Sequence, residues 1–118
     1  MRKKILICDD EYGVQESYKL VLDREYDLTI AKDGVEGLEK FKAGTFDLVI
    51  LDLKLPKKDG LELLGDIKAV DPNATVIIIT GYQSASLAEK AIRLGAKDYL
   101  TKPFEKESLR KTVRELVS

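Results

Sequence analysis

Residues 48–56 read LVILDLKLP, and this stretch decides the fold. Four aliphatic side chains in a row are typical of a strand buried on both faces, as in a parallel sheet. The run ends at Asp52, whose charged carboxylate is costly to remove from water. A buried strand that leads directly into a carboxylate indicates that this group has a role at the strand end.

Four other apolar runs share the length and character of this one. Together the five predicted strands are Ile5–Cys8, Leu28–Ala31, Leu48–Leu51, Val76–Ile79 and Tyr99–Leu100. Between and after them, apolar residues recur at helical spacing within residues 14–22, 35–41, 63–70, 88–92 and 109–117. Strands that alternate strictly with helices predict a doubly wound α/β fold, with helices on both faces of a parallel sheet. Right-handed crossovers favour the strand order 2-1-3-4-5.

Glycine and proline mark the predicted ends of three helices. Gly44 and Gly95 follow the second and fourth helices, where we expect a left-handed cap. Pro72 follows the third helix, at a point where proline prevents the helix from continuing.

Length and composition restrict the classes of protein that this chain can belong to. Its 118 residues suit one core, so we expect a single domain over 1–118, either free-standing or part of a longer protein. Twenty basic and 21 acidic residues give a net charge of −1, which argues against direct nucleic-acid binding. No apolar stretch has the length of a membrane span. The single cysteine excludes an intrachain disulfide and favours the cytoplasm.

Polar residues follow four of the predicted strands. Asp9 and Asp10 follow the first strand, Asp52 the third, Thr80 the fourth and Lys102 the fifth. Taken singly, either of the first two aspartates could cap a helix, Asp52 could hold a turn, and Lys102 could be solvated. Taken together they predict a site, because the first and third strand ends lie side by side in the predicted sheet.

The residue types at these strand ends indicate metal-assisted phosphoryl chemistry. Clustered carboxylates repel one another unless a cation lies between them. The chain has no histidine, and all-oxygen ligands favour a hard ion, Mg²⁺ rather than Ca²⁺. The Thr80 hydroxyl and the Lys102 ammonium suit phosphoryl oxygens. We therefore predict that Asp52 is a nucleophile that forms an aspartyl-phosphate.

Four segments carry a resemblance to a known family. ILICDDE (5–11), DLVILDLKLPKKDGLELL (47–64), VIIITGY (76–82) and AIRLGAKDYLTKPF (91–104) occur in this order. They resemble the receiver domain of response regulators in bacterial two-component systems, also called CheY-like, and the match covers essentially the whole chain. The third and fourth segments are most similar to receivers attached to sigma-54-dependent activators. The resemblance implies a flavodoxin-like fold.

The resemblance also implies the role of each strand-end residue. Asp52 would take a phosphoryl group from a phosphohistidine on a sensor histidine kinase or a histidine phosphotransfer protein. Asp10, Asp52 and the backbone carbonyl of Lys54 would bind Mg²⁺, or Mn²⁺ in its place, with Asp9 acting through water. Lys102 would contact the phosphoryl group or Asp52, and it would precede a cis peptide bond. Thr80 and Tyr99 would form the switch pair.

Such a domain is not an enzyme with a separate substrate, although it catalyses its own phosphorylation and dephosphorylation. Its implied partners are the kinase, a downstream effector domain or protein, and a second copy in a phosphorylation-dependent homodimer.

Other classes of protein fit the sequence less well. A flavin domain needs a Ser/Thr/Gly-rich loop after the first strand, and a nicotinamide domain needs G-x-G-x-x-G there; DDEYGV (9–14) provides neither. Phosphohydrolases with an aspartate nucleophile usually place it on the first strand with a second aspartate two residues later, where this chain has Glu11. A receiver-like interaction module that is never phosphorylated is the alternative that shares the fold.

Overall fold

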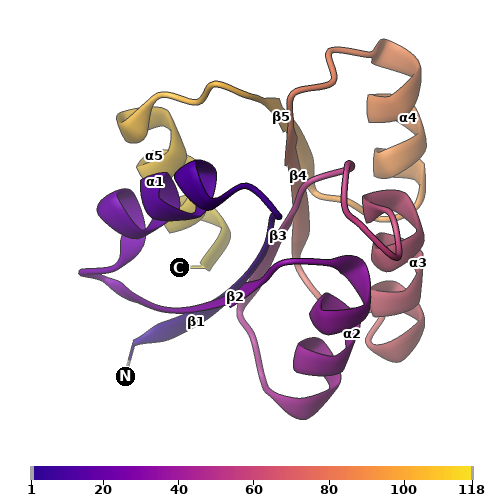
Figure 1. Ribbon diagram of the computed structural model, residues 1–118, viewed down its shortest axis with the longest axis horizontal. Coiled ribbons are helices and arrows are strands. Elements are labelled where there is room, and N and C mark those ends of the chain that lie inside the picture. Colours follow the sequence, from indigo (N-terminus) through magenta and orange to yellow (C-terminus); the bar gives the residue numbers. More distant parts are fainter. Residues whose placement is uncertain (1, 118) are drawn as a thin grey trace.

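The computed structural model describes residues 2–117, in which five strands alternate with five helices (Figure 1). The strands are β1 (Lys3–Cys8), β2 (Tyr26–Ala31), β3 (Leu48–Leu51), β4 (Val76–Thr80) and β5 (Asp98–Thr101). The helices are α1 (Tyr12–Leu22), α2 (Gly34–Ala43), α3 (Gly60–Val70), α4 (Ala85–Arg93) and α5 (Lys106–Val117). Every predicted strand and helix is present, so the predicted element order is confirmed.

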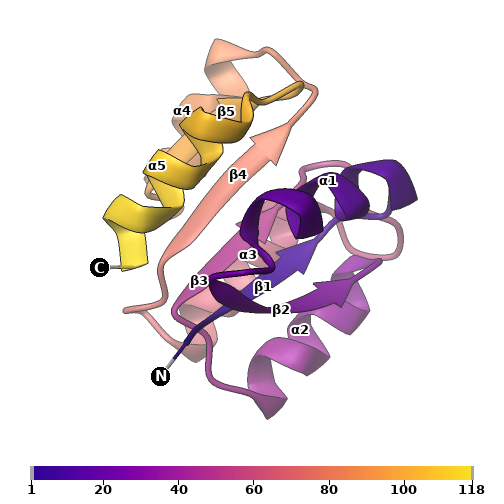
Figure 2. The same ribbon diagram turned by 90° about the vertical axis from the view of Figure 1, so that its left-hand side faces the viewer.

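All strand pairs are parallel, and the sheet has the order β2-β1-β3-β4-β5. Helices α1 and α5 cover one face, while α2, α3 and α4 cover the other (Figures 1 and 2). The predicted doubly wound α/β fold is therefore confirmed. Within the described residues, no helix is both long and apolar enough to span a bilayer.

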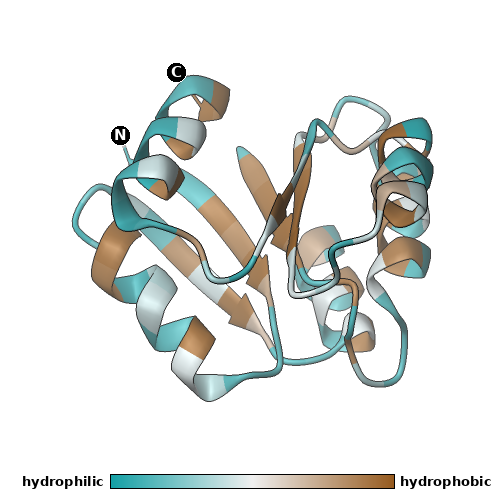
Figure 3. Ribbon diagram, turned by 90° about the horizontal axis from the view of Figure 1, so that it is seen from above, coloured by the Kyte–Doolittle hydropathy of each residue, from teal (hydrophilic) through white to brown (hydrophobic). Residues whose placement is uncertain are grey.

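The central strand β3 contributes to a separate core on each face of the sheet. Val49 and Leu51 pack with the α2–α3–α4 face, whereas Leu48 and Ile50 pack with the α1–α5 face. All four are buried, as is every residue of β4. The strands are accordingly hydrophobic in the middle of the molecule, while parts of the outer strands are hydrophilic (Figure 3). This burial on two faces explains why LVIL shows no polar alternation.

One of the two predicted glycine caps is correct and the other is wrong. Gly95 has a φ of 112°, a backbone conformation that residues other than glycine rarely adopt. Gly44 instead has extended backbone, with φ −125° and ψ −173°. A Cβ at Gly44 would lie 3.1 Å from the ring of Phe46, so this glycine makes room for an aromatic side chain rather than a left-handed turn.

The apolar stripes of the helices are narrower than the periodicity predicts. Val35, Val70 and Ile92 continue the predicted stripes but are exposed. Each lies within two residues of the end of its helix, where fewer neighbours surround a side chain. The predicted stop at Pro72 is correct, because α3 ends at Val70.

Backbone hydrogen bonds extend the sheet just beyond the strand ends. The Asp9 N–H donates to Ala31 O (3.0 Å), the Asp52 N–H to Cys8 O (3.0 Å) and the Lys102 N–H to Thr80 O (2.8 Å). These bonds fix the backbone of the residues that follow β1, β3 and β5 relative to neighbouring strands. Polar residues of distant sequence segments are thereby held at one edge of the sheet.

Candidate functional site

Polar side chains are buried where the carboxyl ends of β1, β3 and β4 meet. Asp9, Asp52 and Thr80 are exposed by only 1%, 4% and 1% of their surface. Asp10 and Glu11 lie beside them but are exposed. Because a buried charge is costly unless it is paired, such a concentration of buried polar groups requires a compensating partner.

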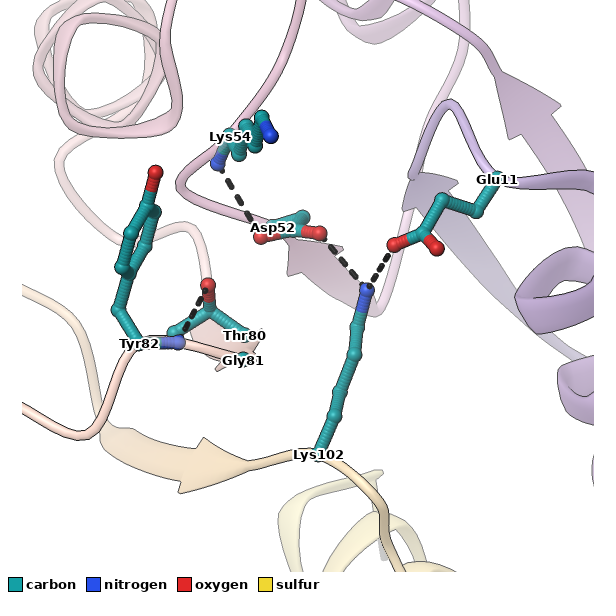
Figure 4. A pocket seen from close by; sticks show the side chains of 7 residues that line it. All are labelled: Glu11, Asp52, Lys54, Thr80, Gly81, Tyr82 and Lys102. Atoms are coloured by element: carbon teal, nitrogen blue, oxygen red, sulfur yellow. Dashed lines mark hydrogen bonds and ion pairs between the residues drawn. The ribbon is translucent and has the colours of Figure 1, made fainter.

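Lys102 is that partner. Its Nζ lies 2.8 Å from Asp9 Oδ2, 2.7 Å from Asp52 Oδ2 and 3.4 Å from Glu11 Oε1 (Figure 4 shows the last two). The lysine side chain is itself only 13% exposed. It therefore forms charge-assisted hydrogen bonds to carboxylates from two strand ends, the strong kind of hydrogen bond. The alternative interpretation of Lys102 as a solvated lysine is wrong.

Burial and pairing act in opposite directions on the pKa values of this cluster. Burial raises the pKa of Asp9, although the hydrogen bonds from Lys102 and the Glu11 N–H partly oppose this effect. Burial lowers the pKa of Lys102, but the hydrogen bonds to Asp52 and Asp9 outweigh it, and the net pKa is raised. The lysine is thus held in its charged form between the two carboxylates.

The acidic side chains form a group that can hold a cation. Asp9, Asp10, Glu11 and Asp52 each offer a carboxylate oxygen, and these oxygens lie within 4.8 Å of one another. One ammonium cannot neutralise four carboxylates, and the donors are all hard oxygens, so the group fits a hard divalent ion such as Mg²⁺. The fold brings Asp9, Asp10 and Asp52 together, as their positions at the ends of adjacent strands predicted. Glu11 is the member to which sequence reasoning assigns no role, although its place directly after Asp10 was a usable signal.

A cavity of about 200 Å³ opens beside Asp52 (Figure 4). Its lining consists of Glu11, Asp52, Lys54, Thr80, Gly81, Tyr82 and Lys102. A water molecule takes about 30 Å³ of liquid volume, so the cavity has room for a small anion together with water. Lys54 donates its backbone N–H to Asp52 Oδ1 (3.1 Å), which orients the carboxylate from the side opposite Lys102.

Neither Asp9 nor Asp10 caps helix α1, so that alternative is also wrong. The N-cap of α1 is Glu11, without a hydrogen bond from its side chain. Asp9 Oδ1 accepts from the Glu11 N–H (2.9 Å), one residue before the helix begins, and its other oxygen faces Lys102. The turn between β1 and α1 uses one carboxylate oxygen of Asp9 and leaves the other for the site.

The two predicted switch residues both bind the backbone of Tyr82. Thr80 Oγ1 accepts from the Tyr82 N–H at 3.5 Å, a long contact, and the Tyr99 hydroxyl donates to Tyr82 O at 2.7 Å. Tyr99 is half-buried and packs against the core of the α2–α3–α4 face. Tyr82 is thus a connection that residue spacing alone did not indicate. The Lys102–Pro103 peptide bond is cis, as predicted.

Comparisons with known proteins agree with this geometry. The family profile of the response regulator receiver domain matches residues 5–114. Sporulation initiation phosphotransferase F of Bacillus subtilis is 36% identical over 116 residues, which cover 98% of this chain and 94% of that protein. The transcriptional regulatory protein ZraR of Klebsiella oxytoca is 38% identical over 115 residues, 97% of this chain but 26% of that protein.

A solved structure is similar over the same range. The CheY-like response regulator receiver domain protein of Methanospirillum hungatei superposes with a TM-score of 0.94 at 34% identity, covering 99% of this chain and 94% of that one. With a family match over most of the chain and relatives above 30% identity, the chain belongs to the response regulator receiver domain family, the phosphoacceptor signalling domains of two-component systems.

Proposed function

We propose that Asp52 is the residue of this receiver domain that accepts the phosphoryl group, from a phosphohistidine on a sensor histidine kinase or a histidine phosphotransfer protein. One observation carries the proposal: Asp52 is a buried carboxylate at a strand end, 2.7 Å from the Lys102 ammonium and at the wall of a cavity that Thr80 also lines. A buried nucleophile with positioned donors around it is what phosphoryl transfer requires.

The transfer exchanges one bond to phosphorus for another. A carboxylate oxygen of Asp52 attacks the phosphorus, and the P–O bond forms as the P–N bond breaks. The electron pair leaves with the imidazole, which takes up a proton from solvent. Lys102 donates to the phosphoryl oxygens, and the Thr80 hydroxyl offers a second donor from β4. Attack by water on the same phosphorus reverses the modification, so the domain acts on itself and not on a separate substrate.

Asp10, Asp52 and the backbone carbonyl of Lys54 are the proposed Mg²⁺ ligands, with Asp9 acting through water and Mn²⁺ as a substitute ion. The support is the cluster of carboxylate oxygens within 4.8 Å of one another. When bound, the ion neutralises negative charge that develops on the phosphoryl oxygens. Asp9 and Asp52 already bind Lys102, which leaves the exposed Asp10 as the carboxylate with most freedom to meet an ion.

The output of the domain is proposed to pass through Thr80 and Tyr99 to a downstream effector domain or protein. Phosphorylation is also proposed to promote a homodimer that forms through α4, β5 and α5. Two cations of that face are engaged within their own helices, Arg93 with Glu89 (2.6 Å) and Arg110 with Glu107. These pairs are solvent-exposed and weak, so they do not prevent a second copy from competing for the arginines.

Residues 1–118 are proposed to form one cytoplasmic domain, free-standing or part of a longer regulator. The single cysteine, Cys8, is buried, and burial raises the pKa of its thiol to about 12, which suits an inert core residue. The finer assignment to receivers of sigma-54-dependent activators rests on the resemblance of residues 76–82 and 91–104. The complete set of buried acids, hydroxyl and lysine argues against an interaction module that is never phosphorylated.

The first prediction tests the acceptor. Asp52→Asn should abolish the mass gain that acetyl phosphate produces in Mg²⁺, because the amide lacks the nucleophilic oxygen. The matched control is Asp59→Asn, which removes a carboxylate from the same loop and keeps a residue able to cap α3. Intact-protein mass spectrometry measures both. Undiminished labelling of Asp52→Asn would end the assignment.

The second prediction concerns the electrostatic role of Lys102. Lys102→Met leaves two buried carboxylates unpaired and should lower the free energy of unfolding by about 3 kcal/mol in chelator. The same change should strengthen Mg²⁺ binding, because a competing positive charge is gone, yet slow labelling, because a phosphoryl donor is gone. Chemical denaturation measures the free energy of unfolding, and calorimetric titration measures the affinity for Mg²⁺. The exposed Lys97→Met is the control, and weaker Mg²⁺ binding by Lys102→Met would contradict the argument.

The third prediction tests the metal site. Asp10→Ala should weaken Mg²⁺ binding and slow acetyl phosphate labelling by about 10-fold or more, since a ligand is lost. Because Asp10 is exposed, circular dichroism should show an unchanged fold. In the unaltered protein, Mg²⁺ should raise the melting temperature as its occupancy rises. Equal labelling rates with Mg²⁺ and with excess chelator would refute the proposed metal site.

The fourth prediction tests the switch. Thr80→Ala should still accept phosphate at Asp52, because the nucleophile and Lys102 remain. Phosphorylation should then produce smaller chemical-shift changes at Tyr99 and along α4 than in the unaltered protein, since the hydroxyl that senses the phosphoryl group is absent. NMR spectra at equal phosphorylation measure this difference. A full response from the variant would show that Thr80 is not the relay.

A further inference from the structure

We propose that Gly34, the first residue of α2, is a positioning residue for the phosphorylation site although it lies outside that site. It acts through the loop of residues 52–59, which joins β3 to α3 and contains Asp52 and Lys54. This inference rests on the proposed function, in which these two residues bind the metal and Asp52 accepts the phosphoryl group.

Gly34 meets the loop in direct backbone contact. Its N–H donates to Pro56 O at 3.1 Å. A Cβ built on Gly34 would lie 2.0 Å from the carbonyl oxygen of Lys58 and 2.6 Å from the Cβ of Lys58. Both obstructing atoms belong to or adjoin the main chain, so no rotation of a flexible side chain can relieve the overlap. Glycine is required here because the backbones of α2 and the loop lie so close together, not because residue 34 has an unusual backbone angle.

Helix α2 can move away from the loop only by giving up close packing on the same face. One turn after Gly34, a Cβ on Gly37 would lie 2.9 Å from Cys8 Sγ and 3.0 Å from a methyl group of Leu63. The helix is therefore already in close contact with β1 and with α3. Moving α2 back to admit a side chain at residue 34 would open these contacts, which costs packing energy, so we expect the loop to be displaced as well.

The loop has little capacity to absorb such a displacement near its end. Lys57 has a φ of 69°, unusual for a lysine, which shows that the chain turns tightly beside the contact. Leu53 and Leu55 are buried, and the Gly60 N–H donates to Leu53 O at 2.9 Å. The end of the loop also touches the acceptor directly, because a Cβ on Gly60 would lie 2.2 Å from Asp52 O, so displacement near Lys58 strains the backbone of Asp52.

The same loop sets the orientation of the acceptor. The Lys54 N–H donates to Asp52 Oδ1 at 3.1 Å, and Asp52 Oδ2 accepts from Lys102. A displaced loop would change the direction of the Lys54 carbonyl and the bond that holds Asp52. The ion pair between Lys57 and Asp33 (3.5 Å) also spans this contact, but the lysine is largely exposed and the pair contributes little.

The experiment compares Gly34→Ala with Gly65→Ala. Gly65 lies in the middle of α3 and has nothing within 4 Å of a built Cβ, so it is the matched change without an obstruction. Gly34→Ala should weaken Mg²⁺ binding by about 10-fold or more, the usual effect of losing a residue that supports a metal ligand. It should slow acetyl phosphate labelling at low Mg²⁺, with partial recovery at high Mg²⁺. Gly65→Ala should leave both quantities unchanged.

The measurement separates positioning from a loss of stability. Circular dichroism on the same samples gives the folded fraction, so the Mg²⁺ affinity can be expressed per folded molecule. If Gly34 served stability alone, the substitution would not change that affinity. If Gly34→Ala folds poorly, the change is repeated in the Gly65→Ala background, where alanine in an open helix position adds stability.

A second measurement needs no substitution. Because coupling between two sites is reciprocal, Mg²⁺ binding should slow hydrogen exchange at the Gly34 amide and shift its NMR signal along with those of Asp52 and Lys54. Saturation of the metal site without any change at Gly34 or Lys58 would overturn the proposal. So would unchanged affinity in folded Gly34→Ala. If the unaltered protein is not labelled at Asp52, the proposed function fails instead, which is a separate outcome.

Discussion

The contact between the Lys102 ammonium and the carboxylates of Asp9 and Asp52 is the interaction on which the site depends. Removing ions from water costs several kcal/mol each, even after relaxation of the protein. Here the lysine is 13% exposed and the two carboxyl side chains 1% and 5%. The cost is offset only because each oxygen that faces the lysine lies within hydrogen-bonding distance of it. Loss of any partner would leave an uncompensated charge in the interior.

The sheet makes this contact possible. Asp9 and Asp52 follow β1 and β3, which are neighbours, whereas Lys102 follows β5 and must reach across the end of β4. The register aligns Cys8 with Leu51 and Leu51 with Ile78, so β1 and β3 end level; β4 and β5 both continue two residues further, to the pair Thr80 and Thr101. The long lysine side chain spans the remaining gap beside Thr80. A slip of one residue in any strand would turn its terminal side chain to the opposite face.

A change of charge at Asp52 can reach several elements because the cavity is shared between their loops. Thr80 and Tyr99 both bind the Tyr82 backbone, which lies between the cavity and α4. The Tyr99 ring is half-buried, and its hydroxyl donates to Tyr82 O in an exposed contact. Shifting a two-state equilibrium from 1:99 to 99:1 takes about 5.5 kcal/mol, more than the roughly 0.5–1.5 kcal/mol of one hydrogen bond. Less free energy is needed if the arrangement that phosphorylation favours is already partly populated beforehand.

The sequence by itself determined the element order, the buried character of β3 and the set of acids, hydroxyl and lysine at the strand ends. These follow from local rules, since apolar periodicity reports burial and a parallel sheet gathers its strand ends at one edge. Only the tertiary structure decided that Lys102 binds Asp9 as well as Asp52, that Glu11 joins the cluster, and that Gly44 serves Phe46. It also showed that Gly34 must be small because the Lys58 carbonyl is adjacent. Each of these depends on contacts between segments far apart in the chain, whose distances no local pattern encodes.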